Sequence, residues 1–143
     1  MLSPSLEDYL EEVYRLSQHS NTVRVTDISN KLNVSLPSVT KAFQKLRDQH
    51  YIIYQPYGEV ELTDNGRELG SFLVKRNQLL QDFLELICSR CDFAAEAEAM
   101  EHYLSRATIL AIQSLVVFMK TNPECYDSFL HFLNDPASDE THF

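Results

Sequence analysis

Several features that would indicate a secreted, membrane-spanning or disulfide-bonded protein are absent from this chain or scarce in it. The 143 residues include three cysteines, an odd number that argues against a disulfide framework in a chain without a secretory signal. No apolar run reaches transmembrane length, and the first residues carry acidic groups where a signal peptide requires a basic patch and an apolar core. We therefore expect a cytoplasmic protein with reduced thiols and no membrane partner.

The common motifs of nucleophilic and nucleotide-dependent catalysis are also missing. The sequence has no glycine-flanked serine, no glycine-rich phosphate loop and no Cys/His pair at a known spacing. We predict that the protein is not an enzyme and takes no small-molecule substrate. With only three glycines, no low-complexity tract and 44% hydrophobic residues, the composition indicates a folded, mostly helical chain.

The charge of the chain is unevenly distributed along the sequence. The net charge is -9, which alone argues against a nucleic-acid partner. However, residues 24–47 contain five lysines and arginines against Asp27 alone, whereas residues 77–143 contain three against eleven acidic residues. A locally basic surface can bind phosphates, and an acidic remainder limits non-specific association or attracts cations.

Hydrophobic periodicity predicts a helix-turn-helix near the N-terminus. A first helix, with Ser5 as its N-cap, is expected to run to about Ser17. A short helix capped by Thr26 follows, then a turn at residues 33–34 and a longer helix from about Ser35. This order and spacing are typical of a DNA-binding helix-turn-helix, although an unrelated helical protein can contain a similar corner.

The segments after the longer helix predict a wing and a helical second half. Two short strands are expected at residues 51–54 and 59–62, and a long helix capped by Thr63 is expected to end near Cys88. Further helices are expected over residues 94–104, 107–120 and 123–133.

These elements predict a mainly α fold with a small β wing. We expect an N-terminal winged helix-turn-helix DNA-binding domain over residues 1–70 and a C-terminal helical metal-binding and dimerisation region over residues 71–143. The apolar stretch 109–119 is too apolar for a solvated helix in a small monomer, so we interpret it as core plus a dimer surface.

The longer helix of the helix-turn-helix is the predicted recognition helix. Val39, Phe43 and Leu46 form its buried stripe, which leaves small polar and basic residues facing outward. Hydroxyl and amide groups can read base edges, and lysine or arginine can pair with phosphates. The predicted DNA-binding residues are Ser35, Pro37, Ser38, Thr40, Lys41, Gln44, Lys45 and Arg47, with Tyr57 and Gly58 at the wing tip.

Two groups of acidic residues have the spacing of metal ligands on helices. Glu98, Glu101 and His102 follow the pattern E-x-x-E-H, and Asp8 and Glu11 repeat the i, i+3 interval. The two groups would face each other if the first helix packs on the second half of the chain. A set of oxygen donors with one nitrogen donor favours Mn(II) or Fe(II). Such a set can bind either one or two cations. The alternative to a metal ligand, for any single one of these acids, is an ordinary residue on a solvent-exposed helix face.

The order of these motifs resembles the diphtheria toxin repressor family, in particular its short manganese transport regulators. The matching segments are SLEDYLEEVY, VTDISNKLNVSLPSVTKAFQKL, the wing, LTDNG, the long helix and E-x-x-E-H, which together cover nearly the whole chain. The resemblance implies a homodimeric repressor of metal-uptake genes that binds a palindromic operator in double-stranded DNA when activated by a divalent metal. It implies as ligands Asp8, Glu11, Glu98, Glu101 and His102.

One position departs from that family pattern. Where the resemblance leads us to expect a histidine in the long helix, this chain has Asn77, a weak neutral donor. Three outcomes follow: one well-formed site, a binuclear site in which Asn77 or water substitutes, or a protein that has lost metal control. We favour a retained but altered site with Mn(II), Fe(II) or another transition metal.

Two other functions are compatible with parts of the sequence. The first is a metal-independent winged-helix regulator with a vestigial acidic cluster. The second is a di-metal carboxylate enzyme, although such helical bundles take ligands from four helices and here a wing interrupts the pattern. Cys88 and Cys91 form a single C-x-x-C, for which idle thiols are favoured over a zinc or redox site because no second pair accompanies them.

Overall fold

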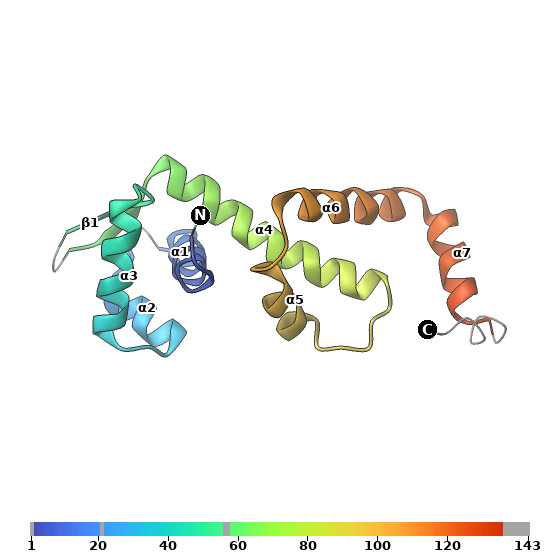
Figure 1. The fold of residues 1–143 in the computed structure, drawn as a ribbon, viewed down its shortest axis with the longest axis horizontal. Coiled ribbons are helices and arrows are strands. Elements are labelled where there is room, and N and C mark those ends of the chain that lie inside the picture. The colour runs from blue at the N-terminus through green and yellow to red at the C-terminus, as the bar shows by residue number, and fades with distance from the viewer. Residues whose placement is uncertain (1, 21, 56–57, 136–143) are drawn as a thin grey trace. The chain divides into compact units, whose positions relative to one another are not determined.

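The computed structural model describes residues 2–20, 22–55 and 58–135. Two compact units divide the chain, Met1–Gln78 (unit 1) and Leu79–Phe143 (unit 2). Helices dominate the described residues, and the strands β1 and β2 form one two-stranded antiparallel sheet (Figure 1). This confirms the predicted mainly α fold with a small β wing.

Helix α1 spans Pro4–Ser17 and is capped by Ser3, not by Ser5 as predicted. The Ser3 hydroxyl accepts a hydrogen bond from the Leu6 amide at 3.2 Å. Pro4 fits the first helical position because that position needs no amide donor and its φ is already helical. The prediction of Ser5 was wrong because it gave no weight to this proline, whereas the predicted end at Ser17 is confirmed.

Helix α2 spans Val25–Leu32, and its N-cap is Arg24 rather than the predicted Thr26. The first turn is closed by the Asp27 carboxylate, which accepts a hydrogen bond from the Arg24 amide at 2.9 Å. At the other end Asn33 adopts a left-handed conformation with φ 53°, which asparagine tolerates better than most residues and which stops the helix. The turn predicted at this point is therefore confirmed.

Helix α3 spans Leu36–Asp48 and starts where the sequence predicted. Ser35 is its N-cap, and the Ser35 hydroxyl accepts a hydrogen bond from the Ser38 amide at 3.3 Å. Val39, Phe43 and Leu46 are fully buried, which confirms the predicted apolar stripe.

The wing follows α3 directly, as predicted. Strand β1 (Ile52–Tyr54) pairs antiparallel with β2 (Val60–Leu62). In both strands the first and third residues are buried and the second is exposed, the alternation expected when one face of a small sheet covers a core. Val23 adds an isolated bridge to Val60 at the open edge of β2.

Helix α4 spans Asp64–Leu86 and begins in unit 1 beside the wing. The Thr63 hydroxyl accepts a hydrogen bond from the Gly66 amide at 3.0 Å, so the predicted cap is confirmed. Gly66 is required for close approach, because a Cβ there would lie 1.9 Å from the Tyr51 carbonyl oxygen. A Cβ at Gly70 would lie 2.7 Å from the Tyr14 Cβ, so α4 also lies tightly against α1.

The core of unit 1 joins all its elements. Phe43 of α3 meets Tyr54 of β1 edge to face with ring centroids 5.5 Å apart, and both pack into a cluster with residues of the other helices and β2. The fully buried members of this cluster are Leu10, Val13, Ile28, Val39, Phe43, Leu46 and Leu73. A single core therefore fixes the recognition helix, the wing and α1 as one body.

The described part of unit 2 contains the end of α4 and three further helices. They are α5 (Phe93–Glu101), α6 (Arg106–Thr121) and α7 (Pro123–Leu133). Asp92 and Ser105 cap α5 and α6 by accepting hydrogen bonds from Ala95 and Thr108 amides. Helix α5 ends three residues earlier than the predicted Leu104, whereas the bounds of α7 match the prediction.

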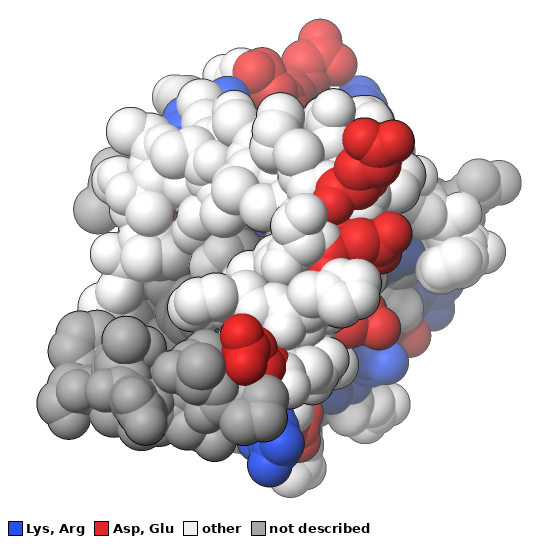
Figure 2. Space-filling model, turned by 90° about the vertical axis from the view of Figure 1, so that its right-hand side faces the viewer, with Lys and Arg blue, Asp and Glu red and all other residues white. Residues whose placement is uncertain are grey.

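Helix α6 buries only a narrow stripe. Ile109 and Val116 are each 3% exposed, while several large apolar side chains remain 42–51% exposed: Leu110, Leu115, Val117 and Phe118. Figure 2, viewed from the α7 side, shows a row of acidic side chains beside a broad surface without charge. Among the described residues, no helix combines the length and apolarity needed to cross a membrane.

Candidate metal centre and nucleic-acid interface

Helix α1 carries the first pair of predicted metal ligands, Asp8 and Glu11. Glu11 is 8% exposed, and burial raises the pKa of its carboxyl above the ordinary value of 4.5. A hydrogen bond and the positive charge of Arg15 lower this pKa, the Asp8 charge raises it, and the Arg76 charge lowers it. A buried carboxylate of this kind is stabilised by a nearby cation.

A buried ion pair holds α4 on α1 in the same region of unit 1. Arg76 of α4 is 5% exposed, and its guanidinium lies 3.3 Å from a carboxylate oxygen of Glu7. The Arg76 guanidinium also lies over the Phe72 ring, 6.0 Å from the centroid. Asn77 is the next residue of α4 and is partly buried. Asp8, Glu11 and Asn77 therefore belong to two helices that the core and this pair fix together.

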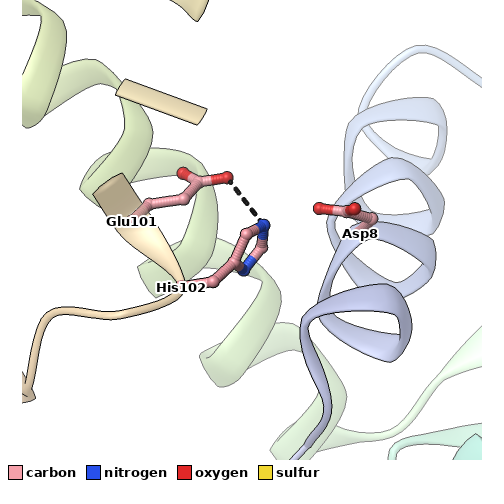
Figure 3. Close-up of side chains that lie close together, drawn as sticks. All are labelled: Asp8, Glu101 and His102. Carbon is pink, nitrogen blue, oxygen red and sulfur yellow. Dashed lines mark ion pairs between the residues drawn. The ribbon is translucent and has the colours of Figure 1, made fainter. Parts of the chain in front are cut away.

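The second group of predicted ligands lies at the end of α5 in unit 2. Glu101 is 1% exposed, and its carboxylate oxygen lies 3.5 Å from Nε2 of His102 (Figure 3). His102 is the C-cap of α5, so the expectation of one helix that continues past it was wrong. Three residues further on, Ser105 caps the new helix α6. Figure 3 also draws Asp8 on α1.

Glu98 differs from Glu101 in its surroundings. It is exposed on α5, one helical turn before the buried Glu101. The structure therefore brings Glu101 and His102 together and leaves the Glu98 side chain exposed to solvent.

The donor atoms in both units suit a divalent metal of intermediate hardness. Unit 1 offers carboxylate oxygens from Asp8 and the buried Glu11, and unit 2 offers the buried Glu101 carboxylate and the His102 imidazole. Carboxylates with a single imidazole fit Mn(II) and Fe(II), whereas thiolates would favour zinc or copper. The buried carboxylates of Glu11 and Glu101 also fit a metal centre, because a bound cation compensates buried negative charge.

The three cysteines are free thiols. Cys88 and Cys125 are exposed and Cys91 is partly buried. Cys88 follows the end of α4 in a left-handed conformation with φ 59°.

The recognition helix presents the predicted polar surface. Ser35, Pro37, Ser38, Lys41, Gln44, Lys45 and Arg47 are exposed, and Thr40 is partly exposed. The Arg47 guanidinium lies 3.6 Å from the neighbouring Asp48 carboxylate. This surface combines groups that can read base edges with cations that can pair with phosphates.

The wing tip is described only in part. Tyr57 lies outside the described residues, and Gly58 is partly exposed. Beside Gly58, the Glu59 carboxylate lies 4.0 Å from the Arg24 guanidinium.

Sequence reasoning missed three residues at these sites. Leu36, in the first turn of α3, is 47% exposed and can offer an apolar contact to a thymine methyl group. The sequence signal for this residue was an apolar side chain that lies off the buried stripe of residues 39, 43 and 46. Arg15 and Arg76 lie beside Glu11 and Glu7, and only the i, i+4 spacing of Arg15 and Glu11 was visible in the sequence.

A winged helix-turn-helix unit and a helical unit with carboxylate and imidazole donors together define a DNA-binding regulator of the metal-dependent class. Comparison with known families gives the same result. Residues 1–60 match the iron dependent repressor N-terminal DNA binding domain, and residues 63–139 match the iron dependent repressor metal binding and dimerisation domain. The chain belongs to the iron-dependent repressor family, whose members are metal-dependent transcriptional regulators.

Individual relatives agree with this assignment. The HTH-type transcriptional regulator MntR of Geobacillus kaustophilus is 40% identical over 121 residues, covering 84% of this chain and 86% of the relative. The structure of the manganese regulator SloR superposes with TM-score 0.70 and 26% identity over 82% of this chain. A manganese-dependent transcriptional repressor in complex with manganese gives TM-score 0.69 and 27% identity over 79% of this chain. The chain spans about half the length of these solved regulators, 55% and 53%.

Proposed function

We propose that this protein is a homodimeric repressor of metal-uptake genes that binds a palindromic DNA operator when it holds Mn(II) or Fe(II). The observation that carries the proposal is the presence of buried acidic donors in both units of a chain that belongs to the iron-dependent repressor family: Glu11 in unit 1 and Glu101 in unit 2. Because its target is genomic DNA, we place its action in the cytoplasm. We assign it no enzymatic activity and no small-molecule substrate, since its relatives are transcriptional regulators.

The proposed metal ligands come from both units. Asp8 and Glu11 supply carboxylates from α1, Glu101 and His102 supply a carboxylate and an imidazole, and Glu98 is a further ligand. A divalent cation bound by this set neutralises acids that are costly to bury and joins residues distant in sequence. Asn77 is a weak neutral donor, so we propose a retained but altered site in which one metal position is weakened, remodelled or absent.

Metal control of DNA binding is proposed to act through a shift in populations. The domain over residues 1–70 carries the recognition helix, and the region over residues 71–143 supplies ligands and the dimer surface. Because both regions supply ligands, a bound metal is proposed to favour one arrangement of the DNA-binding domain and the dimerisation region. In that arrangement the two recognition helices of the dimer match successive major grooves. The shift is limited by the difference in metal affinity between the arrangements.

The recognition helix and wing divide the DNA contacts by chemistry. Ser35, Pro37, Ser38 and Gln44 are proposed to contact base edges, with Thr40 beside them. Lys41, Lys45 and Arg47 are proposed to pair with phosphates, which places the helix in the groove without reading sequence. Tyr57 and Gly58 at the wing tip are proposed to contact the backbone or the minor groove.

The dimer surface is proposed to include the apolar face of α6. Leu110, Leu115, Val117 and Phe118 leave 42–51% of their surface exposed. The matching family domain is described as a dimerisation domain, so we assign this face to a second copy of the chain.

The test is a mobility-shift assay on the DNA upstream of the protein's own gene, with Mn(II) and with chelator. We expect binding only with metal, and loss of that response in Glu101→Gln. The matched control is Glu96→Gln, because Glu96 is exposed on the same helix. Equal DNA binding in chelator and in Mn(II) would remove the corepressor role.

A metal-independent regulator is the second candidate. The observations that favour it are the exposed Glu98, the neutral Asn77 and the ion pair that already compensates Glu11. Calorimetric titration with Mn(II), Fe(II), Co(II) and Zn(II) separates the two candidates. Heat of binding with any of these metals supports the sensor, and its absence with all four supports the metal-independent regulator.

A further inference from the structure

Arg15 forms an ion pair with a proposed metal ligand on its own helix. Its guanidinium nitrogen Nη2 donates a hydrogen bond to Oε1 of Glu11 at 2.9 Å. The two side chains differ in exposure: the Glu11 side chain is 10% exposed and the Arg15 side chain is 42% exposed. One end of the pair is therefore anchored in the protein, and the other end is free to move into solvent.

Arg76 is the other guanidinium near Glu11, and its setting is different. Its side chain is 5% exposed and is held by Glu7 and by the Phe72 ring. Arg76 is thus a fixed charge in the core of unit 1, whereas the Arg15 side chain is already 42% exposed and can move further into solvent. Of the two cations near Glu11, Arg15 is the one that a bound metal can replace.

We propose that Arg15 is a built-in competitor for the metal at Glu11, which sets the metal concentration at which the regulator responds. This inference rests on the proposed metal-dependent function. In the metal-free protein the guanidinium compensates the buried Glu11 carboxylate. When a divalent cation binds, Glu11 turns its oxygen to the metal and Arg15 moves to solvent.

The size of the effect follows from the exposure of the pair. An ion pair between residues i and i+4 of one helix lies in the lower half of the range for surface pairs, and the burial of Glu11 strengthens this one. Its loss is subtracted from the free energy of metal binding. The positive charge of Arg15 also repels the incoming cation. Removing Arg15 is expected to tighten Mn(II) binding about five-fold, equivalent to about 1 kcal/mol.

The experiment is a calorimetric titration of the metal-free full chain with Mn(II) at neutral pH, for the unaltered protein, Arg15→Gln and Arg15→Met. Arg15→Met keeps an unbranched stem that packs like the arginine stem, so it provides a second test if Arg15→Gln folds poorly. The matched control is Arg67→Gln, because Arg67 forms an exposed ion pair of 3.3 Å with Asp64 on α4 of the same unit.

A second measurement separates competition from a merely structural role. Urea unfolding in chelator is expected to show a lower midpoint for both Arg15 variants, because Glu11 loses its partner, together with the tighter Mn(II) binding. A purely structural arginine would give lower stability with equal or weaker Mn(II) binding, and that result overturns the inference. If both Arg15 variants bind Mn(II) with the affinity of the unaltered protein, the inference about Arg15 is overturned and the proposed function stands. No Mn(II) binding by any variant overturns the proposed function as well.

Discussion

At the scale of single residues, Asn77 is the candidate donor that α4 would offer to the proposed metal site. An amide oxygen is a weaker neutral donor than imidazole for Mn(II) or Fe(II), and Asn77 directly follows the buried Arg76 on α4. We predict that Asn77→His raises Mn(II) affinity on the order of ten-fold or adds a second bound ion per chain. Calorimetric stoichiometry and affinity measure both. Gln78→His, at the exposed neighbouring position, is the control, and a titration unchanged from the asparagine protein would contradict the prediction.

The spacing of the candidate donors could be read from the sequence, but the burial of each donor could not. The intervals of Asp8 with Glu11 and of Glu98 with Glu101 and His102 follow from helical periodicity. Two acids at the same helical spacing differ in burial, because Glu101 is buried whereas Glu98 is exposed to solvent. Which acids are buried depends on tertiary packing, which spacing alone does not specify.

A phosphate-binding residue can be tested by its salt dependence. Lys41 is exposed on α3, and a lysine that pairs with phosphate releases about one counterion on binding. We predict that Lys41→Gln weakens binding to specific and non-specific DNA alike and lowers the slope of log K against log salt by about one. Fluorescence anisotropy over a salt series measures the slope. Lys120→Gln, in unit 2, should leave the slope unchanged; an altered base preference with an unchanged slope would instead make Lys41 a base-reading residue.

At the scale of elements, α3 and the wing are held together by Phe43. Its ring is fully buried and meets the Tyr54 ring of β1 at 5.5 Å. We predict that Phe43→Ala lowers the free energy of unfolding by about 3–5 kcal/mol, since it removes buried apolar contacts and leaves a cavity. Urea denaturation followed by circular dichroism measures it. Leu36→Ala, at a 47% exposed position of the same helix, should change stability by less than about 0.5 kcal/mol.

Elements with strong local signals were predicted well. The start of α3 at Ser35 and the cap of α4 at Thr63 each have a serine or threonine directly before the helix, and both caps make the expected hydrogen bond. The errors at helix starts occurred where two candidate caps compete. At α2 the Asp27 carboxylate accepts a hydrogen bond from the Arg24 amide. With this contact Arg24 is the N-cap of the helix, before the threonine that was predicted as its cap. A hydrogen bond between side chain and backbone of this kind is decided by geometry, which the sequence pattern does not contain.

At the scale of the whole molecule, the proposed assembly depends on the exposed apolar face of α6. Phe118 is 48% exposed on this helix, and in a two-fold symmetric dimer any change to it acts twice. We predict that Phe118→Lys raises the dimer dissociation constant by at least about 100-fold, because the two-fold interface would bury two unpaired ammonium groups. Sedimentation equilibrium measures the dissociation constant, and circular dichroism checks that the helices persist.

The same substitution links assembly to DNA binding. A monomer reaches one half-site only, so Phe118→Lys should reduce affinity for a palindromic site far more than affinity for an isolated half-site. Gln113→Lys adds the same charge at an exposed polar position of α6 and is the matched control. A dimer that persists in Phe118→Lys at micromolar concentration would show that another surface joins the two copies. In that case the exposed side chains of α6 require a different explanation, while the metal ligands and the recognition helix keep their proposed roles.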